Sequence, residues 1–313
     1  MLILKPSSAE QHRASRMVAL FGVGTVGSAV ARRLTSNNWC VTRRFHLPWA
    51  EREQLQLALA AVHDELTQHE QSQDDHPVSL VWCAGRAGFD ASAREAANEM
   101  AAFEQVLYLF KTVRQRLRIV HWHQISSAGG LFEGQRLVTT TSQPNPRRSY
   151  GLLKLQQESA LRDLADDAHT IYRLSSVFAP LRQGQRCGLI PTMARNGVLG
   201  RTTRIAGRST TLRDFTWADD IAAFIEREIQ SPNQGEPKTL ILASGRPMSI
   251  GEAHWLIEQA LRRRLYVSYV DQHNGSDITY AAQSIPEHFV RTELHGCIRH
   301  VCRMSLQQPA QIE

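Results

Sequence analysis

Two side chains capable of acid–base chemistry share one predicted helix. Tyr150 and Lys154 stand four residues apart in a stretch with helical spacing, residues 150–165, so both lie on the same face of that helix. A free phenol is a poor base at neutral pH, and a nearby ammonium favours the phenolate form. Lys154 is one of only four lysines among 36 basic residues, so general composition does not readily explain it. The pair predicts a proton-exchanging tyrosine tuned by a lysine.

A pair of serines ends a predicted strand over residues 117–125. Ser126 and Ser127 are followed by Ala-Gly-Gly. The carboxyl ends of the strands are where ligands bind in a parallel sheet. We therefore expect the Ser127 hydroxyl to hydrogen-bond the substrate oxygen that exchanges a proton with Tyr150.

A glycine-rich loop joins the first predicted strand, residues 17–21, to a helix. Gly22, Gly24 and Gly27 form G-x-G-x-x-G around Thr25 and Val26. In such loops the first glycine makes a tight turn, the second lets the backbone approach a pyrophosphate, and the third lets helix and strand pack closely. The unpaired N–H groups of the helix N-terminus attract the phosphates. The loop predicts dinucleotide binding.

Two arginines occupy the position at which a residue usually contacts the adenosine ribose. An acidic residue about 20 positions after the loop would bind the 2′-hydroxyl of NAD. Here Arg43 stands 21 positions after Gly22 and Arg44 follows it. Because cations suit a 2′-phosphate, this predicts NADP as the preferred cofactor, with NAD as the alternative.

Strands alternate with helices through most of the chain, which predicts an α/β fold, a Rossmann-like doubly wound parallel sheet. The expected strands are 17–21, 40–42, 78–84, 117–125 and 170–178, and the expected helices are 28–34, 55–66, 94–113 and 150–165. Residues 1–15 are interpreted as a polar extension, so that the first element begins near Arg16. We expect a dinucleotide-binding domain over 16–180. A smaller C-terminal substrate-binding cap is expected over 181–313, with returns to the main sheet at about 205–245.

Together these motifs resemble the extended short-chain dehydrogenase/reductases, specifically the NAD-dependent epimerase/dehydratase family that acts on nucleotide sugars. The resemblance covers roughly residues 17–261. The sequence from Tyr150 to Lys154 is similar to that family's active-site helix, and Ser127 matches its catalytic serine. Residues 81–85 resemble its strand and turn beside the nicotinamide, and residues 173–180 and 212–222 resemble its substrate-binding segments.

The resemblance implies further roles. Lys154 would also hold the nicotinamide ribose, and Ala84 and Gly85 would line the nicotinamide. Ser176 and Arg213 would bind the substrate, with Arg213 on its diphosphate through paired hydrogen bonds. A homodimer through helices 94–113 and 150–165 is implied as well. The sequence departs from the family at Phe21, where a glycine is usual, and at Ser176, where asparagine is common. It also lacks the Asp-Glu pair of the dehydratases after Ser127, which disfavours dehydration.

The expected function is that of an NAD(P)-dependent nucleotide-sugar epimerase or 4-keto reductase, and the two stay open because both use the same residues. One alternative is a reductase of non-nucleotide carbonyl compounds. The other is a catalytically silent, dinucleotide-binding regulatory or scaffold protein.

Composition argues against several other classes. The formal charge is +6, but the arginines are spread along the chain without a nucleic-acid-binding motif. No apolar run has the ~18–20 residues that span a bilayer. The five cysteines are scattered without metal-binding spacing, so we expect no metal and reduced thiols in a cytoplasmic protein. His121 and His123 are expected to serve strand packing, and Asp219 and Asp220 to complement a helix dipole.

Overall fold

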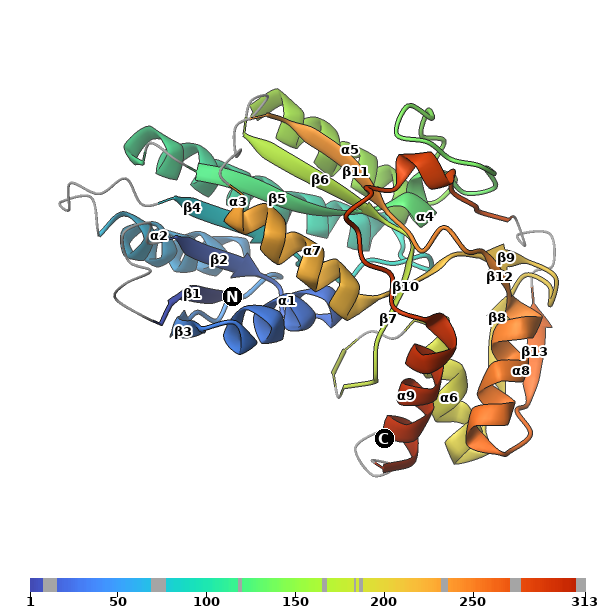
Figure 1. Cartoon of the computed structure of the whole chain (residues 1–313). Helices are drawn as coiled ribbons and strands as arrows, with labels where there is room; N and C mark the ends of the chain where they lie inside the picture. Colours follow the sequence, from blue (N-terminus) through green and yellow to red (C-terminus); the bar gives the residue numbers. More distant parts are fainter. Residues whose placement is uncertain are drawn as a thin grey trace. The chain divides into compact units, whose positions relative to one another are not determined.

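The fold is described from a computed structural model (Figure 1), which covers residues 1–7, 16–68, 77–117, 120–164, 168–182, 184–185, 188–231, 236–270 and 277–307. The chain divides into two units. The first unit comprises Met1–Leu131, Pro146–Arg173 and Ile225–Thr239. The second unit comprises Phe132–Asn145, Leu174–Phe224 and Leu240–Glu313.

A seven-stranded sheet has the order β11-β6-β5-β4-β2-β1-β3. Its strands are β1 (Leu2–Pro6), β2 (Met17–Phe21), β3 (Trp39–Arg44), β4 (Val78–Trp82), β5 (Val120–Ser127), β6 (His169–Leu174) and β11 (Lys238–Leu242). Strands β2, β4 and β5 pair in parallel. Every residue of β2 and β4 is buried, as expected for strands covered on both faces. The predicted α/β, Rossmann-like fold is confirmed.

The N-terminal strand corrects one sequence prediction. The first element begins at Leu2 rather than near Arg16, and β1 lies between β2 and β3, antiparallel to both. Ile3 pairs with Ala19 on one side and with Arg43 on the other. The apolar run over residues 1–4 is too short to predict a strand from the sequence alone. It is nevertheless long enough to form a strand between β2 and β3. Residues 8–15 of the predicted extension lie outside the described residues.

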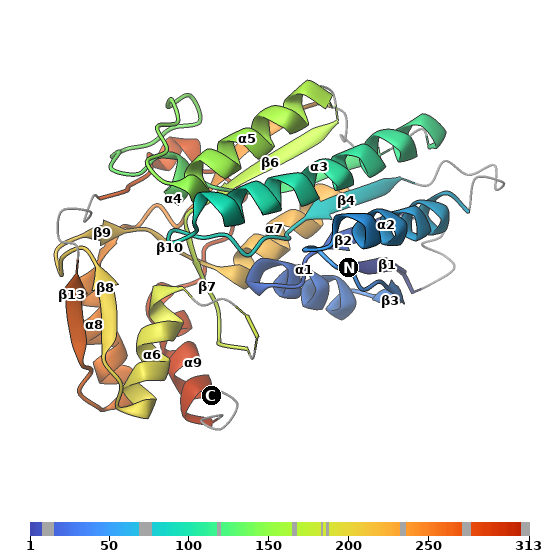
Figure 2. The same ribbon diagram turned by 180° about the vertical axis from the view of Figure 1, so that it is seen from behind.

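Helices cover both faces of the sheet (Figures 1 and 2). One face carries α2 (Arg52–Thr67), α3 (Ala93–Arg116) and α5 (Ser149–Leu164); the other carries α1 (Thr25–Ser36) and the C-terminal part of α7 (Ala218–Gln230). Aromatic rings fill the core under α3: Trp82, Phe103 and Trp122 pack with centroids 5.0–6.4 Å apart. This packing holds α3 on the sheet, and α5 lies beside α3.

The second unit has its own apolar core, which is built around three helices. These are α6 (Leu189–Leu199), α8 (Ile250–Leu261) and α9 (Leu294–Gln307), which pack against one another. Short strand pairs accompany them: β7 (Ser176–Phe178) with β10 (Phe215–Trp217), β8 (Thr203–Ala206) with β13 (Val267–Val270), and β9 (Leu212–Arg213) with β12 (Met248–Ser249). The strand predicted over 170–178 is split at Ser175, between β6 and β7. No helix in the described parts of the chain is long and apolar enough to cross a membrane.

Candidate active site

The glycine loop has the local geometry that a bound pyrophosphate needs. Gly22 has φ +89°, and a Cβ there would lie 2.4 Å from the Ala84 backbone. A Cβ on Gly27 would lie 2.0 Å from the carbonyl oxygen of Gly22. Gly24 has no atom within 4 Å of where its Cβ would be, and it begins α1 without a side-chain cap. The crowding at two glycines therefore shapes the turn, and the space at the third leaves room for a phosphate.

The loop also meets the end of the next strand. Because Gly22 packs on Ala84, the turn at Ala84 and Gly85 lies directly beside the glycine loop. Gly85 has φ +137°, a backbone conformation that favours glycine. The structure thus brings together the two segments that the sequence assigned to the dinucleotide.

Ser127 ends β5 and begins the short helix α4 (Ala128–Leu131). Its Oγ accepts a hydrogen bond of 3.1 Å from the Gly130 amide. Because the amide is the donor, the hydroxyl proton of Ser127 stays available to donate to an oxygen of a ligand. The side chain is 8% exposed, so it is held in place and still accessible.

Tyr150 lies in the first turn of α5, against the same short helix. A Cβ on Gly130 would come within 3.0 Å of the Tyr150 ring, so a glycine is needed for this close contact. The Lys154 ammonium lies 5.7 Å from the centre of the Tyr150 ring. Gly130 thus contacts both Ser127 and Tyr150, and Lys154 lies beside Tyr150, so the sequence-predicted trio lies where β5, α4 and α5 come together.

Phe89 is a neighbour of the trio that sequence reasoning missed. Its ring centre lies 5.9 Å from that of Tyr150, and the Arg148 guanidinium lies 5.4 Å from the Phe89 ring centre. The ring is 42% exposed, although large apolar side chains are usually buried. An aromatic residue in a loop gives no distinctive sequence signal, so only the fold reveals its place beside Tyr150.

Glu99 on α3 is a second neighbour that the sequence analysis missed. Its carboxylate accepts a hydrogen bond of 3.1 Å from Lys154 Nζ, which also donates to Gln157 Oε1 at 2.9 Å. A sequence signal did exist. Glu99 stands three residues after Ala96 and four before Phe103, both buried, so a charge lies on the apolar stripe of the helix.

A buried ion pair anchors the far side of α5. Glu158 accepts hydrogen bonds from Arg173 at 2.8 Å and from Ser126 Oγ at 2.6 Å. Burial alone would raise the Glu158 pKa, but the hydrogen bonds and charges of Arg173, Ser126 and Arg162 outweigh it, and the pKa is lowered. The pair ties β5, α5 and β6 together directly behind Ser127.

The predicted 2′-phosphate residues lie apart from the glycine loop. Arg44 pairs with Leu2, and Leu2 pairs in turn with Leu20 of β2. The arginine strand is therefore two strand spacings from β2, roughly 9–10 Å, instead of one. Arg43 is turned to α2, where its Nε donates to Glu65 at 3.2 Å.

The two predicted substrate residues lie in the second unit, Ser176 in β7 and Arg213 in β9. The Ser176 amide donates to the carbonyl oxygen of Asp214, next to Arg213. The Asp214 carboxylate is buried and accepts hydrogen bonds from the Ser244 and Gly245 amides. Asp214 therefore fixes the strand that carries Arg213.

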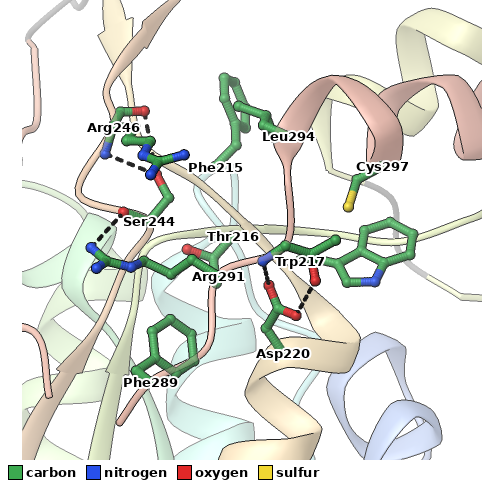
Figure 3. Close-up of a pocket in the computed structure, with 11 residues that line it drawn as sticks. Phe215, Thr216, Trp217, Asp220, Ser244, Arg246, Phe289, Arg291, Leu294 and Cys297 are labelled. Atoms are coloured by element: carbon green, nitrogen blue, oxygen red, sulfur yellow. Dashed lines mark hydrogen bonds between the residues drawn. The ribbon is translucent and has the colours of Figure 1, made fainter. Parts of the chain in front are cut away.

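A small cavity of about 20 Å³ in the second unit has Arg291, Asp220 and Thr292 at its wall (Figure 3). Asp220 accepts hydrogen bonds from the Thr292 amide and hydroxyl at 2.8 and 2.6 Å. Burial raises the Asp220 pKa despite these bonds. Asp220 thus holds the segment before α9, a role beyond the helix-dipole effect expected from sequence. The cavity has room for about one water molecule.

The histidines of β5 pack between strands, as the sequence analysis expected. His121 Nε2 lies 2.9 Å from Thr170 Oγ1, and His123 Nδ1 lies 2.8 Å from the Tyr172 hydroxyl. Burial lowers the pKa of His123 well below its usual value. Both partners belong to β6, so these contacts join β5 to β6 through side chains.

Comparisons with known proteins place this geometry in a family. Among the solved structures that resemble the chain are three epimerases. One is a UDP-glucose 4-epimerase from Thermus thermophilus in complex with NAD, with a TM-score of 0.75 and 14% identity over 92% of this chain and 98% of that one. Another is a UDP-glucose 4-epimerase from Thermotoga maritima with UDP-glucose, with a TM-score of 0.70 and 14% identity over 93% of this chain and 98% of that one. The third is a UDP-glucuronic acid 4-epimerase from Bacillus cereus with UDP-glucuronic acid and NAD, with a TM-score of 0.70 and 16% identity over 95% of this chain and 99% of that one. No curated protein matches the sequence. The sequence model of the NAD dependent epimerase/dehydratase family matches residues 19–243, more than half of the chain, and the chain belongs to that family.

Proposed function

We propose that the protein is an NAD-dependent epimerase of a nucleotide-diphosphate sugar. The observation that carries this proposal is that Ser127, Tyr150 and Lys154 lie near one another in the first unit. The same unit contains the glycine loop, which has free space beside Gly24. A silent scaffold has no need of a serine, a tyrosine and a lysine in this arrangement. The family to which the chain belongs supports the same reaction class.

The reacting sugar oxygen would lie between Ser127 and Tyr150. Ser127 donates its hydroxyl proton to that oxygen while its Oγ stays held by the Gly130 amide. Tyr150 removes the proton from the sugar hydroxyl and later returns it, so it acts as base and then as acid. Lys154 lies one helical turn further along α5, with its ammonium 5.7 Å from the centre of the Tyr150 ring. The nicotinamide, when bound, supplies the reversible two-electron oxidation of the sugar carbon.

The glycine loop and the turn at Ala84 and Gly85 would hold the dinucleotide, with Lys154 on the nicotinamide ribose. We propose NAD rather than NADP. The inserted strand β1 moves Arg44 one strand further from the loop, and Arg43 already pairs with Glu65. A 4-keto reductase was favoured by the arginine pair alone, so we place the epimerase ahead of it.

The second unit would bind the nucleotide sugar, with Arg213 on the diphosphate and Ser176 nearby. The structural neighbours from Thermotoga maritima and Bacillus cereus are complexes with UDP-glucose and UDP-glucuronic acid, so we propose a UDP-sugar. We further propose a homodimer formed through the exposed sides of α3 and α5. Arg213→Ala should raise KM for the UDP-sugar by about tenfold or more, because a charge-assisted contact is lost.

Incubation of the protein with NAD and each of several UDP-sugars tests the proposal. Proton NMR resolves the 4-epimers of a sugar, so it reports turnover without a coupled enzyme. We expect at least one of UDP-glucose, UDP-galactose and UDP-glucuronic acid to approach an epimer equilibrium. If none reacts, and a 4-keto sugar is instead reduced at the expense of a reduced dinucleotide, the protein is a reductase.

A further inference from the structure

Glu99 lies between two parts of the proposed cofactor site, and one carboxylate contacts both. Oε1 accepts from Lys154 Nζ at 3.1 Å. Oε2 accepts from the backbone amides of Arg86 and Ala87 at 3.0 and 2.9 Å. These amides belong to the turn that follows β4. The Glu99 side chain is 8% exposed and that of Lys154 is 7% exposed, so solvent does little to weaken the bond between these two side chains.

The turn is shaped around this carboxylate. Gly85 has φ +137°, and a Cβ there would lie 2.5 Å from Glu99 Oε1. Any other residue at this position would therefore collide with the carboxylate as well as strain the backbone. Gln157 completes the arrangement, because its Oε1 accepts from Lys154 at 2.9 Å. The lysine, the turn and α3 are thus held in one fixed geometry.

We propose that Glu99 is a positioning residue that sets the Lys154 ammonium and the Gly85–Ala87 turn together for the nicotinamide half of the dinucleotide. This inference rests on the proposed function. Glu99 does not contact the reacting atoms in this scheme. It acts by holding two groups that do contact the cofactor, so its loss disturbs both at once.

A glutamate side chain is suited to hold both Lys154 and the turn after β4. A carboxylate only accepts, and it offers both oxygens to donors on opposite sides. In Glu99→Gln one oxygen becomes an NH2 group, which faces either the Lys154 ammonium or the amides of the turn. A donor then opposes a donor, and one side of the arrangement must open. Glu99→Asp keeps the charge but is one methylene shorter, so it cannot reach both sides.

The test measures the NAD dissociation constant and the hydrogen exchange of the Arg86 and Ala87 amides, the latter on protein without dinucleotide. In Glu99→Gln we expect faster exchange at both amides and NAD binding weakened about tenfold, the loss of roughly one charge-assisted hydrogen bond. Glu99→Asp should show an intermediate affinity, and it carries the test if the glutamine variant does not fold. Glu104→Gln is the matched control: it removes the same charge from an exposed position of α3 and should bind NAD like the wild type.

Two outcomes separate the inference from the function on which it rests. If the wild type binds NAD and the folded Glu99 variants bind it equally well, Glu99 has only a structural role and the inference is overturned. If the wild type itself binds no NAD, the proposed function fails. Faster exchange of the Arg86 and Ala87 amides together with weaker NAD binding, both absent from Glu104→Gln, supports the inference.

Discussion

Arg43 of β3 pairs with Ile3 of β1 and not with the glycine-bearing strand β2. An antiparallel strand is therefore inserted into the half of the sheet that would hold the adenosine. Ile3 is completely buried, so the strand is part of the core. The insertion would change which side chains reach the ribose of a bound adenosine, although the turn at Gly22 keeps its geometry.

This relationship predicts the cofactor preference. Since the arginine pair is two strand spacings from β2, NAD should bind at least as tightly as NADP. The double variant Arg43→Ala and Arg44→Ala should change the NADP dissociation constant less than threefold, below the effect of one charged hydrogen bond. Titration of both dinucleotides into both proteins checks this. A clear NADP preference that disappears in the double variant would show that the arginines do reach the 2′-phosphate.

The glycines of the loop should separate binding from stability. Gly24→Ala adds a methyl group where no atom lies within 4 Å, so the melting temperature should stay close to that of the wild type. The methyl group occupies the space that a phosphate needs, and NAD affinity should fall about tenfold or more. Gly27→Ala meets the Gly22 carbonyl oxygen at 2.0 Å and should cost about 3 kcal/mol of unfolding free energy. Wild-type NAD affinity in Gly24→Ala would contradict the assignment of the loop.

The Glu158–Arg173 pair should dominate the acid sensitivity of the first unit. Glu158→Gln leaves Arg173 buried without its counter-charge and should cost about 3–5 kcal/mol of unfolding free energy. Because the folded-state pKa of Glu158 is lowered, its stabilisation is present above the ordinary glutamate value and is lost as pH falls through the lowered pKa. Denaturant unfolding at several pH values measures both effects.

The control for this pair is Arg162→Ala. Arg162 bonds the same carboxylate, but its side chain is 39% exposed, so its removal should cost no more than about 1 kcal/mol. Equal losses in the Glu158 and Arg162 variants would mean that burial of the pair is not what matters.

His123 should impose a second pH dependence near neutrality. Burial lowers its pKa in the folded state, whereas in the unfolded chain it takes up a proton below about pH 6.5. Stability is therefore complete above that value and falls below it by about 1.4 kcal/mol per pH unit. His123→Asn should flatten the slope of unfolding free energy against pH by about one proton. The same slope in His123→Asn as in the wild type would show that His123 does not cause it.

Much of the fold followed from local pattern. The alternation of buried strands with amphipathic helices predicted the sheet, and the glycine spacing predicted the turn at Gly22. The strand Leu2–Pro6 was missed because antiparallel insertion is a long-range event, and the four apolar residues before Lys5 are a run of only minimal length for a strand. The interpretation of Arg43 as a contact of the 2′-phosphate depends on the same long-range event. Counting residues from the loop assumes that consecutive strands are neighbours, and here they are not.

The proposed reacting groups could be recognised in the sequence, whereas the residues that contact and support them could not. Ser127, Tyr150 and Lys154 stood out by type and spacing. Glu99 resembled any surface acid of a long helix, and only its place on the buried stripe set it apart. Phe89 gave no signal, because its contact with Tyr150 brings together a loop after β4 and a helix that are far apart in the sequence. Partners fixed by tertiary packing need the fold before they can be recognised.

The central claim is that Tyr150 exchanges a proton with a nucleotide sugar that bound NAD oxidises and reduces. The direct measurement compares Tyr150→Phe with the wild type, in NAD affinity by titration and in UDP-sugar epimerisation by NMR. We predict an NAD dissociation constant within a factor of about two of the wild-type value and turnover lower by about 10²–10⁴-fold, the usual contribution of a general acid–base group. Undiminished turnover in Tyr150→Phe would contradict the account.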